Sequence, residues 1–317
     1  MNKMKYDIIT FGGAVVDAFI YTNVHEVKKE MCYPVGEKIE INKLHFETGG
    51  GGTNTAVSFA KLGLKTGAII KLGKDGNSQL ILNELKKNKI DFLGKQEDGL
   101  TDFSVILDSK EHDRTILTYK EKSNDIALPE VSLMKLKTSW FYFSAADNSS
   151  LDTQKALALY ASKNNIKIAY NPSSYLTKKG INHIKKILDH TEVLILNDEE
   201  ARDLVPEGDL FKGLHTLGPK IVCITFGGQG NKVSDGNRVL TSIPRKIKIA
   251  ERTGAGDAFA SGFVAGIIKT NDIETAIKIG SLNAESVIQI PGAKNGLLTW
   301  KEISSQLKQN LIKVKSG

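Results

Sequence analysis

The chain has 317 residues, of which 40% are apolar and 25% are charged, a composition that is typical of a folded globular protein and excludes a largely disordered one. Its formal net charge of +7 suits anionic ligands, but the lysines are scattered and argue against a nucleic-acid partner. Cys32 and Cys223 have no zinc-like spacing and indicate no disulfide framework. The start resembles no signal peptide, and no apolar stretch is long enough to span a bilayer. We therefore expect a cytoplasmic protein without a membrane partner.

Strand-like and helix-like segments alternate along most of the chain. Runs of β-branched and aromatic residues predict strands at 6–11, 66–72, 140–143, 166–170, 193–196 and 221–225. Apolar residues recur at helical spacing in 54–62, 79–85, 151–163, 258–269 and 273–290. This alternation predicts an α/β fold with a mostly parallel sheet that is covered by helices on both faces.

Two regions lack the intervening helix. Residues 38–46 and 103–117 alternate like strands and predict a small antiparallel sheet, a lid formed by insertions at about 34–47 and 101–119. Residues 233–240 predict a hairpin around Asp235-Gly236-Asn237. No Pro-rich or Ser-rich linker interrupts the chain, so we expect a single domain over residues 1–317 that carries the lid. The exposed edges of the lid strands would suit a homodimer that pairs through the lid.

The segment 251–259, Glu-Arg-Thr-Gly-Ala-Gly-Asp-Ala-Phe, leads into an apolar predicted helix. The N–H groups of Gly254, Ala255 and Gly256 would then be free at the positive end of the helix dipole, which favours an anion. Asp257 is either an ordinary helix cap or a carboxylate beside a bound phosphate, where it could act as a base. The spacing is not that of a GxxxxGK[ST] phosphate loop.

A run of four glycines lies in the segment 48–55, Thr-Gly-Gly-Gly-Gly-Thr-Asn-Thr, directly before a predicted helix. It is either a flexible loop or a turn whose backbone approaches a ligand, with Asn54 donating to that ligand. Asp17 follows the first predicted strand and is either a turn residue or an acceptor for a substrate hydroxyl. Both features favour a ligand site near the start of the chain.

Two later segments follow predicted strands. Asn197 and Glu200 have the spacing of a helix-capping pair, but they also stand where α/β sheets bind ligands. Residues 224–230, Ile-Thr-Phe-Gly-Gly-Gln-Gly, give a glycine-rich turn that a nucleotide could approach closely. Alone, the second segment is only a turn.

Taken together and in this order, these segments resemble the ribokinase-like (PfkB) family of carbohydrate kinases over roughly residues 6–301. The Gly-Ala-Gly-Asp stretch and the glycine loop followed by Gly73-Lys74-Asp75-Gly76 carry most of the resemblance. It implies a Rossmann-like α/β domain with a β-sheet lid. It also implies transfer of the γ-phosphoryl group of ATP, with Mg²⁺ as cofactor, to a hydroxymethyl group of a sugar or sugar derivative.

The resemblance also implies roles for individual residues. Asp257 would be the general base, and the anion hole would be Gly254, Ala255 and Gly256. The acceptor would lie against Asp17, Gly49, Gly50 and Asn54. ATP would lie against Thr225, Gly227 and Gly230, with Asn283 near the adenine and residues 171–174 near the phosphates. Asn197 and Glu200 would organise Mg²⁺, Glu200 through water.

The chain departs from the family pattern in three places. It has Glu251-Arg252-Thr253 where members usually have Asp-Thr-Thr or Asp-Thr-Ile, and that Asp helps to hold a monovalent cation in several members. The loop 292–296 offers few side-chain oxygens, which also argues against potassium. Arg252 would either touch the phosphates or take the role of the ion, unless it points outward. Gly51 stands where ribokinases commonly have Lys, which argues against ribose.

Several alternatives to a sugar kinase stay open. A nucleoside kinase of the same family would need an aromatic side chain against the base, for which Tyr33, Phe46 and Phe103 are candidates. A phosphosugar kinase would need a second cationic site, for which Arg114 or Lys120 could serve. A non-catalytic ligand-binding protein is the alternative from another class, and the intact Asp257 motif argues against it.

Overall fold

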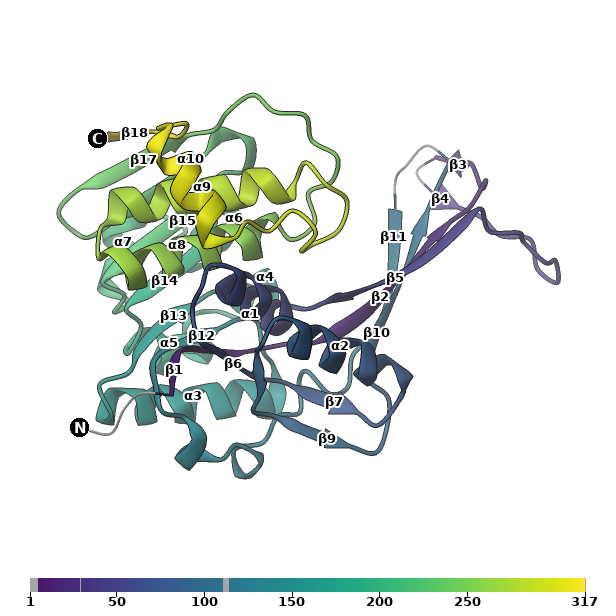
Figure 1. The fold of residues 1–317 in the computed structure, drawn as a ribbon, viewed down its shortest axis with the longest axis horizontal. Coiled ribbons are helices and arrows are strands. Elements are labelled where there is room, and N and C mark those ends of the chain that lie inside the picture. Colours follow the sequence, from purple (N-terminus) through teal and green to yellow (C-terminus); the bar gives the residue numbers. More distant parts are fainter. Residues whose placement is uncertain (1–4, 29, 111–113, 317) are drawn as a thin grey trace.

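The computed structural model describes residues 5–28, 30–110 and 114–316, with a large sheet enclosed by helices and a small sheet that projects from it (Figure 1). The described strands of the large sheet follow the order β18 (Lys313–Ser316), β17 (Val239–Ile243), β16 (Asn231–Ser234), β15 (Ile221–Thr225), β14 (Val193–Asn197), β13 (Lys167–Tyr170), β12 (Thr138–Phe143), β1 (Tyr6–Phe11), β6 (Thr66–Ile69) and β8 (Asp91–Phe92). The pairs from β15 to β8 are parallel, and those from β15 to β18 are antiparallel. The predicted mostly parallel sheet and the hairpin of β16 and β17 are confirmed.

Helices cover both faces of the large sheet. One face packs against α1 (Gly51–Lys61), α8 (Ala255–Thr270), α9 (Ile273–Val287) and α10 (Trp300–Lys308). The other packs against α3 (Asn148–Lys163), α4 (Ser174–Lys178), α5 (Ile181–Leu188), α6 (Asp198–Leu204) and α7 (Leu210–Thr216). In the described residues no helix is long and apolar enough to cross a membrane.

Strand β12 shows why its sequence is apolar throughout. Trp140 and Tyr142 belong to the core on the side of α8, whereas Phe141 and Phe143 belong to the core on the side of α3. Successive side chains of a strand point to opposite faces, so a strand that is covered on both faces needs apolar residues at every position. The sequence pattern therefore follows from the two helical layers.

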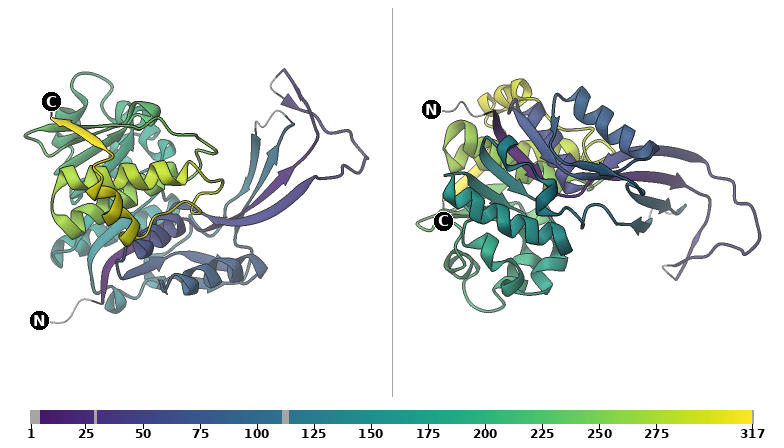
Figure 2. Two further views of the ribbon diagram at one scale, coloured as in Figure 1. Left: turned by 45° about the horizontal axis from the view of Figure 1, so that its top comes forward. Right: turned by 90° about the horizontal axis from the view of Figure 1, so that it is seen from below.

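The small sheet is the predicted lid, and its far end projects away from the helices (Figures 1 and 2). Its strands follow the order β11 (Arg114–Tyr119), β10 (Asp102–Asp108), β2 (Val15–Tyr21) and β5 (Lys43–Gly49). The β2–β10 pair is parallel, and the other two pairs are antiparallel. Two strand pairs outside these sheets are β3 (Glu26–Val27) with β4 (Glu30–Met31), and β7 (Lys71–Gly73) with β9 (Lys95–Glu97).

Two sequence predictions about strands are corrected by the structure. The lid is a mixed sheet and not an antiparallel one, because it includes β2, a segment for which the sequence predicted no strand. The predicted strand 66–72 is divided into β6 and β7, which belong to different sheets. The division takes Lys71 out of the main sheet, and its buried ammonium donates to Asp125 and Glu130.

The carboxyl ends of the parallel strands meet at one edge of the large sheet, the edge from which the lid rises. Helix α1 begins at this edge after β5, and α8 begins there after the loop that follows β17. Helix α2 (Gly76–Lys87) packs against β2 and β5. Open α/β sheets bind ligands outside the carboxyl ends of their strands, so this edge is where a site is expected.

Candidate active site

The N-terminus of α8 has the geometry of an anion site. Gly254 caps the helix in the left-handed region with φ 78°, and a Cβ there would lie 2.4 Å from the carbonyl oxygen of Ala293. Only glycine fits both the backbone conformation and the close approach. The following Ala255 and Gly256 begin the helix, whose first N–H groups have no partner within it.

Asp257 is held in place by a residue from the other end of the chain. Its Oδ2 accepts a hydrogen bond of 2.8 Å from Nδ2 of Asn54 in α1. Burial raises the pKa of the Asp257 carboxyl, and the hydrogen bond from Asn54 and the charge of Lys294 oppose that rise. A carboxyl whose pKa is moved toward neutrality is suited to accept a proton.

The glycine run that leads into α1 forms a tightly packed turn and not a flexible loop. Gly50 caps α1 with φ 92°, and a Cβ there would lie 2.5 Å from the carbonyl oxygen of Gly13. A Cβ on Gly49 would lie 2.4 Å from Oδ2 of Asp17, and one on Gly51 would lie 2.8 Å from Oγ of Ser144. The glycines are therefore needed because the turn after β1, strand β2 and the end of β12 all approach this backbone.

Two cavities meet at this turn. The sheet-edge cavity, about 360 Å³, is lined by Asp257, Gly254 and Gly256 and by residues at the ends of β13, β14 and β15. The lid cavity, about 730 Å³, lies against one face of the lid, here called its cavity-facing side, and is lined by Asp17 and Gly50. Gly51 and Ser144 border both cavities. Asp257 therefore lies beside the junction of the two.

Asp17 lies on the cavity-facing side of the lid and not in a turn. In the register of the sheet it stands between Ser104 of β10 and Glu47 of β5. Burial raises the pKa of the Asp17 carboxyl, and a hydrogen bond with Ser104 and the charge of Lys294 oppose that rise. Its position places an acceptor group in the wall of the lid cavity.

Asn54 occupies a different place from the predicted one. We expected its amide to donate to a ligand, but the amide donates to Asp257. Its Oδ1 is buried without a partner among the described residues, and neither cavity is lined by Asn54. Asn54 is thus placed to orient Asp257, and Gly49, which also lines neither cavity, packs against Asp17.

The opposite wall of the sheet-edge cavity contains Asn197, Glu200 and Thr225. Asn197 and Glu200 form a capping box at the start of α6, with hydrogen bonds of 2.8 and 3.0 Å. Ser174 also donates to Glu200, and burial raises the pKa of that carboxyl. The capping interpretation is therefore observed, and the pair borders the cavity as well.

Other predicted positions do not line either cavity. Gly227 is exposed with open space around it, and Gly230 packs under the carbonyl oxygen of Ser242. Asn283 is fully buried: its amide donates to Ser58 and Ala258, and its Oδ1 accepts from Leu298. The expectation that Asn283 lies near an adenine is therefore corrected, because its polar atoms are used to join α9 to α8 and α1.

The charged residues near the α8 turn differ from the expected ones. Arg252 is exposed and lines neither of the two cavities. The cation beside Glu251 is instead Arg114 of the lid, whose Nη1 donates to Oε1 of Glu251 at 2.9 Å. Sequence reasoning missed Ser144 and Lys294, and only the three-dimensional structure places them here.

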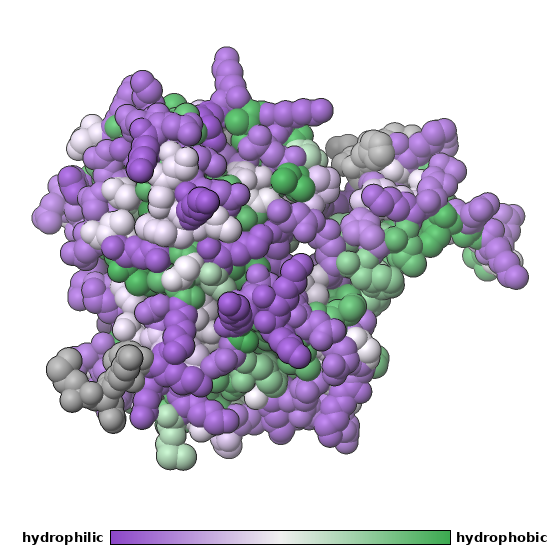
Figure 3. Space-filling view, in the orientation of Figure 1, coloured by the Kyte–Doolittle hydropathy of each residue, from purple (hydrophilic) through white to green (hydrophobic). Residues whose placement is uncertain are grey.

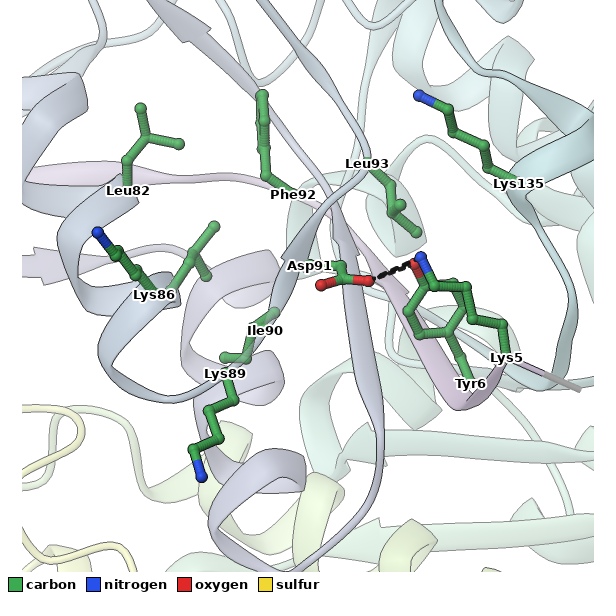
Figure 4. A pocket seen from close by; sticks show the side chains of 11 residues that line it. Lys5, Tyr6, Leu82, Lys86, Lys89, Ile90, Asp91, Phe92, Leu93 and Lys135 are labelled. Atoms are coloured by element: carbon green, nitrogen blue, oxygen red, sulfur yellow. Dashed lines mark hydrogen bonds and ion pairs between the residues drawn. The ribbon is translucent and has the colours of Figure 1, made fainter.

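A third cavity, about 560 Å³, lies near the end of α2 (Figure 4). Asp91 accepts a hydrogen bond of 2.7 Å from Tyr6 and pairs with Lys5 at its wall. The ammonium groups of Lys86 and Lys89 point in different directions. It contains none of the predicted site residues.

Sequence comparison shows which known proteins the chain is similar to. The pattern of the "pfkB family carbohydrate kinase" matches residues 8–300. An "uncharacterized sugar kinase" of Archaeoglobus fulgidus is 27% identical over 252 residues, 76% of this chain and 98% of its own. An ATP-dependent 6-phosphofructokinase of Thermoanaerobacterium thermosaccharolyticum is 25% identical over 292 residues, 88% of this chain and 87% of its own.

Solved structures share the fold. A nucleoside kinase of Methanocaldococcus jannaschii superposes with a TM-score of 0.80 at 22% identity and covers 97% of this chain and 100% of its own. At that identity the likeness concerns the fold. With the family pattern matched over most of its length, the chain belongs to the pfkB family of carbohydrate kinases.

Proposed function

We propose that this kinase transfers the γ-phosphoryl group of ATP to a hydroxymethyl group of a sugar or sugar derivative in the lid cavity. The observation that carries the proposal is the position of Asp257, which lines the sheet-edge cavity and lies next to Gly51, a residue that borders both cavities. ATP would take the sheet-edge cavity and the acceptor would take the lid cavity, against Asp17 and Gly50.

The residues suit an in-line transfer. The acceptor oxygen attacks the γ-phosphorus while the bond to the β–γ bridging oxygen breaks, and ADP leaves. Asp257 accepts the proton of the attacking hydroxyl. The N–H groups of Gly254, Ala255 and Gly256 would stabilise the negative charge of the transferring group, with the helix dipole behind them; that of Ala255 also donates to the carbonyl of Arg252 at 3.3 Å.

Mg²⁺ fits this site as an ion that is held mainly by the nucleotide. No group of three or more His, Cys, Asp or Glu that could hold a metal occurs among the residues the structure describes. Mg²⁺ usually keeps several waters and uses one or two carboxylates together with substrate phosphates. Asn197 and Glu200 would hold it through water, and the ion would neutralise phosphate charge.

Features of the lid cavity bear on the acceptor. Phe46 and Phe103 are candidates for contact with the base of a nucleoside, but they alternate with the cavity-lining residues and so belong to the opposite face of the lid. The aromatic residue that lines the cavity is Tyr175. Arg114 and Lys120 also line it, which favours a phosphosugar as the second candidate.

The test combines an acceptor panel with one substitution. Purified protein is assayed for ADP formation with sugars, sugar phosphates and nucleosides, and Asp257→Asn is assayed with the best acceptor. Asn keeps the shape but cannot accept the proton, so we expect kcat to fall by about 10² or more while ATP still binds. Near-normal turnover of Asp257→Asn would remove Asp257 from the mechanism. ATP binding without turnover on any acceptor would favour a non-catalytic ligand-binding protein.

We further propose that a second copy of the chain covers the outer face of the lid. This face includes Leu44, Phe46, Leu117 and Tyr119, which are 46–55% exposed, and apolar surface extends along the lid in Figure 3. A face without charges along these strands matches itself across a two-fold axis.

Light scattering should give a dimer for the unchanged protein and a monomer for the double variant Phe46→Lys with Leu117→Lys. The matched control is Leu159→Lys, an exposed leucine on α3. A monomeric unchanged protein would refute the lid dimer.

A further inference from the structure

A buried carboxylate fixes the segment 121–125, which follows the lid strand β11. Asp102 of β10 is 1% exposed, and its Oδ1 accepts hydrogen bonds of 2.8 Å from the N–H groups of both Glu121 and Lys122. Its Oδ2 accepts from the N–H of Ser123 at 3.3 Å. Hydrogen bonds to an ionised acceptor are the strong ones, so three successive backbone donors on one carboxylate restrain this main chain.

Two buried ammonium groups hold the same segment near its ends. Lys71 is 3% exposed, and its Nζ donates to the carbonyl oxygen of Asp125 at 2.7 Å and to the Asp125 carboxylate at 2.9 Å. Lys122 is also 3% exposed and donates to Glu121 at 2.8 Å and to Glu97 at 3.1 Å. Glu97 lies 3.1 Å from the ammonium of Lys71 as well. These five residues line neither the sheet-edge cavity nor the lid cavity, and the proposed transfer does not use them.

Between these anchors, Ser123 and Asn124 line the lid cavity. Oγ of Ser123 accepts from the N–H of Ala14 at 3.2 Å, and the carbonyl oxygen of Ser123 accepts from Oγ of Ser150 at 2.8 Å. Asn124 is half-buried, and its side-chain amide makes no hydrogen bond with any residue that the structure describes. A polar side chain without a partner therefore stands on a restrained main chain at the lid cavity.

We propose that Asn124 binds a hydroxyl group of the acceptor, one other than the hydroxyl that is phosphorylated. This inference rests on the proposed function and narrows the acceptor to a polyhydroxylated compound. An amide can both donate and accept, as a hydroxyl can, whereas the ionised carboxylate of Asp17 can only accept. The two side chains line the same cavity from different segments of the chain, so each would bind a hydroxyl of its own.

The anchors explain how a single amide can contribute to affinity. Ordering a loop and a side chain when a ligand arrives costs free energy and weakens binding. The main chain around Asn124 is already held by the bonds to Asp102 on one side and to Lys71 on the other. Asp102 is therefore a positioning residue, which holds the segment in place before the acceptor arrives.

The test compares Asn124→Leu with the unchanged protein on the best acceptor of the panel and on analogues that each lack one of its hydroxyl groups. Leu has a similar size but forms no hydrogen bond. We expect the acceptor KM to rise about tenfold or more and the ATP KM to stay nearly unchanged. On the analogue without the hydroxyl that Asn124 binds, the substitution should add no further loss. A similar loss on every analogue would overturn the proposal.

Asn171→Leu is the matched control, because Asn171 lines the sheet-edge cavity and not the lid cavity. It should change the ATP KM, and an equal rise of the acceptor KM in both variants would also overturn the proposal. If Asn124→Leu does not fold, Asn124→Ala replaces it.

Asp102→Asn tests the anchor itself. It puts a donor in place of one carboxylate oxygen, so hydrogen exchange of the amides of residues 121–123 should become faster and the acceptor KM should rise. An unchanged acceptor KM would refute the positioning role of Asp102.

A binding measurement separates this inference from the proposed function. The sugars, sugar phosphates and nucleosides of the panel are titrated into the protein by calorimetry, which needs no turnover. If a compound binds without being phosphorylated, the proposed function fails, and weaker binding to Asn124→Leu would still support the role of Asn124. Equal binding to both proteins would overturn that role. If no compound binds or is phosphorylated, both proposals fail.

Discussion

Asn54 and Asp257 are 203 positions apart in the chain, and their side chains share a hydrogen bond of 2.8 Å. The bond joins the first turn of α1 to the first turn of α8. The two glycine-rich segments therefore form one site, in which the residue from the first segment orients the proposed base of the second.

Asn54→Ala should act on kcat more than on the KM of the acceptor. The hydrogen bond from Asn54 lowers the pKa of the Asp257 carboxyl, so the loss of this bond raises that pKa. The acidic limb of the activity profile should therefore move to higher pH. The measurement is a pH profile of kcat and of kcat/KM. An effect on the acceptor KM alone, with an unchanged acidic limb, would contradict the orienting role.

Asp17→Ala should raise the acceptor KM by about tenfold or more and leave the ATP KM nearly unchanged, because Asp17 lines only the lid cavity. Asp17→Asn is the matched variant, since it keeps the size of the side chain. Equal effects on both substrates would show that Asp17 supports the lid structure and does not bind the acceptor.

Asp257→Asn should stabilise the fold at neutral pH while it removes activity. The pKa of Asp257 is raised by burial, so the native state binds the proton more tightly than the unfolded state. The free energy of unfolding therefore falls as the pH rises from the ordinary pKa of 3.8 through the raised one. Thermal melts should give a higher Tm for Asp257→Asn at pH 7, with a smaller difference near pH 4. A lower Tm at pH 7 would contradict this assignment.

Turnover should be nearly independent of potassium, with less than about a twofold change between KCl and choline chloride at equal ionic strength. The sequence attributed this independence to Arg252, but the structure supplies Arg114 beside Glu251 and the buried Lys294. The substitution Arg252→Thr should therefore leave turnover unchanged, both with and without potassium. A steep potassium requirement in the unchanged protein would refute the prediction.

The sequence alone was sufficient to predict the fold class and to identify the two glycine-rich segments as candidate parts of a site. The apolar runs of strands such as β12 and the helical spacing of α8 are local patterns, and a glycine beside a helix start restricts the backbone within a few residues. The lid strands β5, β10 and β11 could be predicted for the same reason. Asp257 could be identified as the candidate base because it directly follows the Gly-Ala-Gly turn.

The contacts of the site were decided only by the tertiary structure. Strand β2 follows β1 after a short turn, and its own pattern did not show that it pairs with β10. Asn54 and Asn283 are polar residues in helices, and whether such an amide faces a ligand or a buried carbonyl depends on which helices pack together. Lys294 lies in a loop without a motif, and its burial beside Glu84 arises from chain segments that are distant in sequence. Local patterns determine elements, whereas the partner of a polar side chain depends on packing between elements.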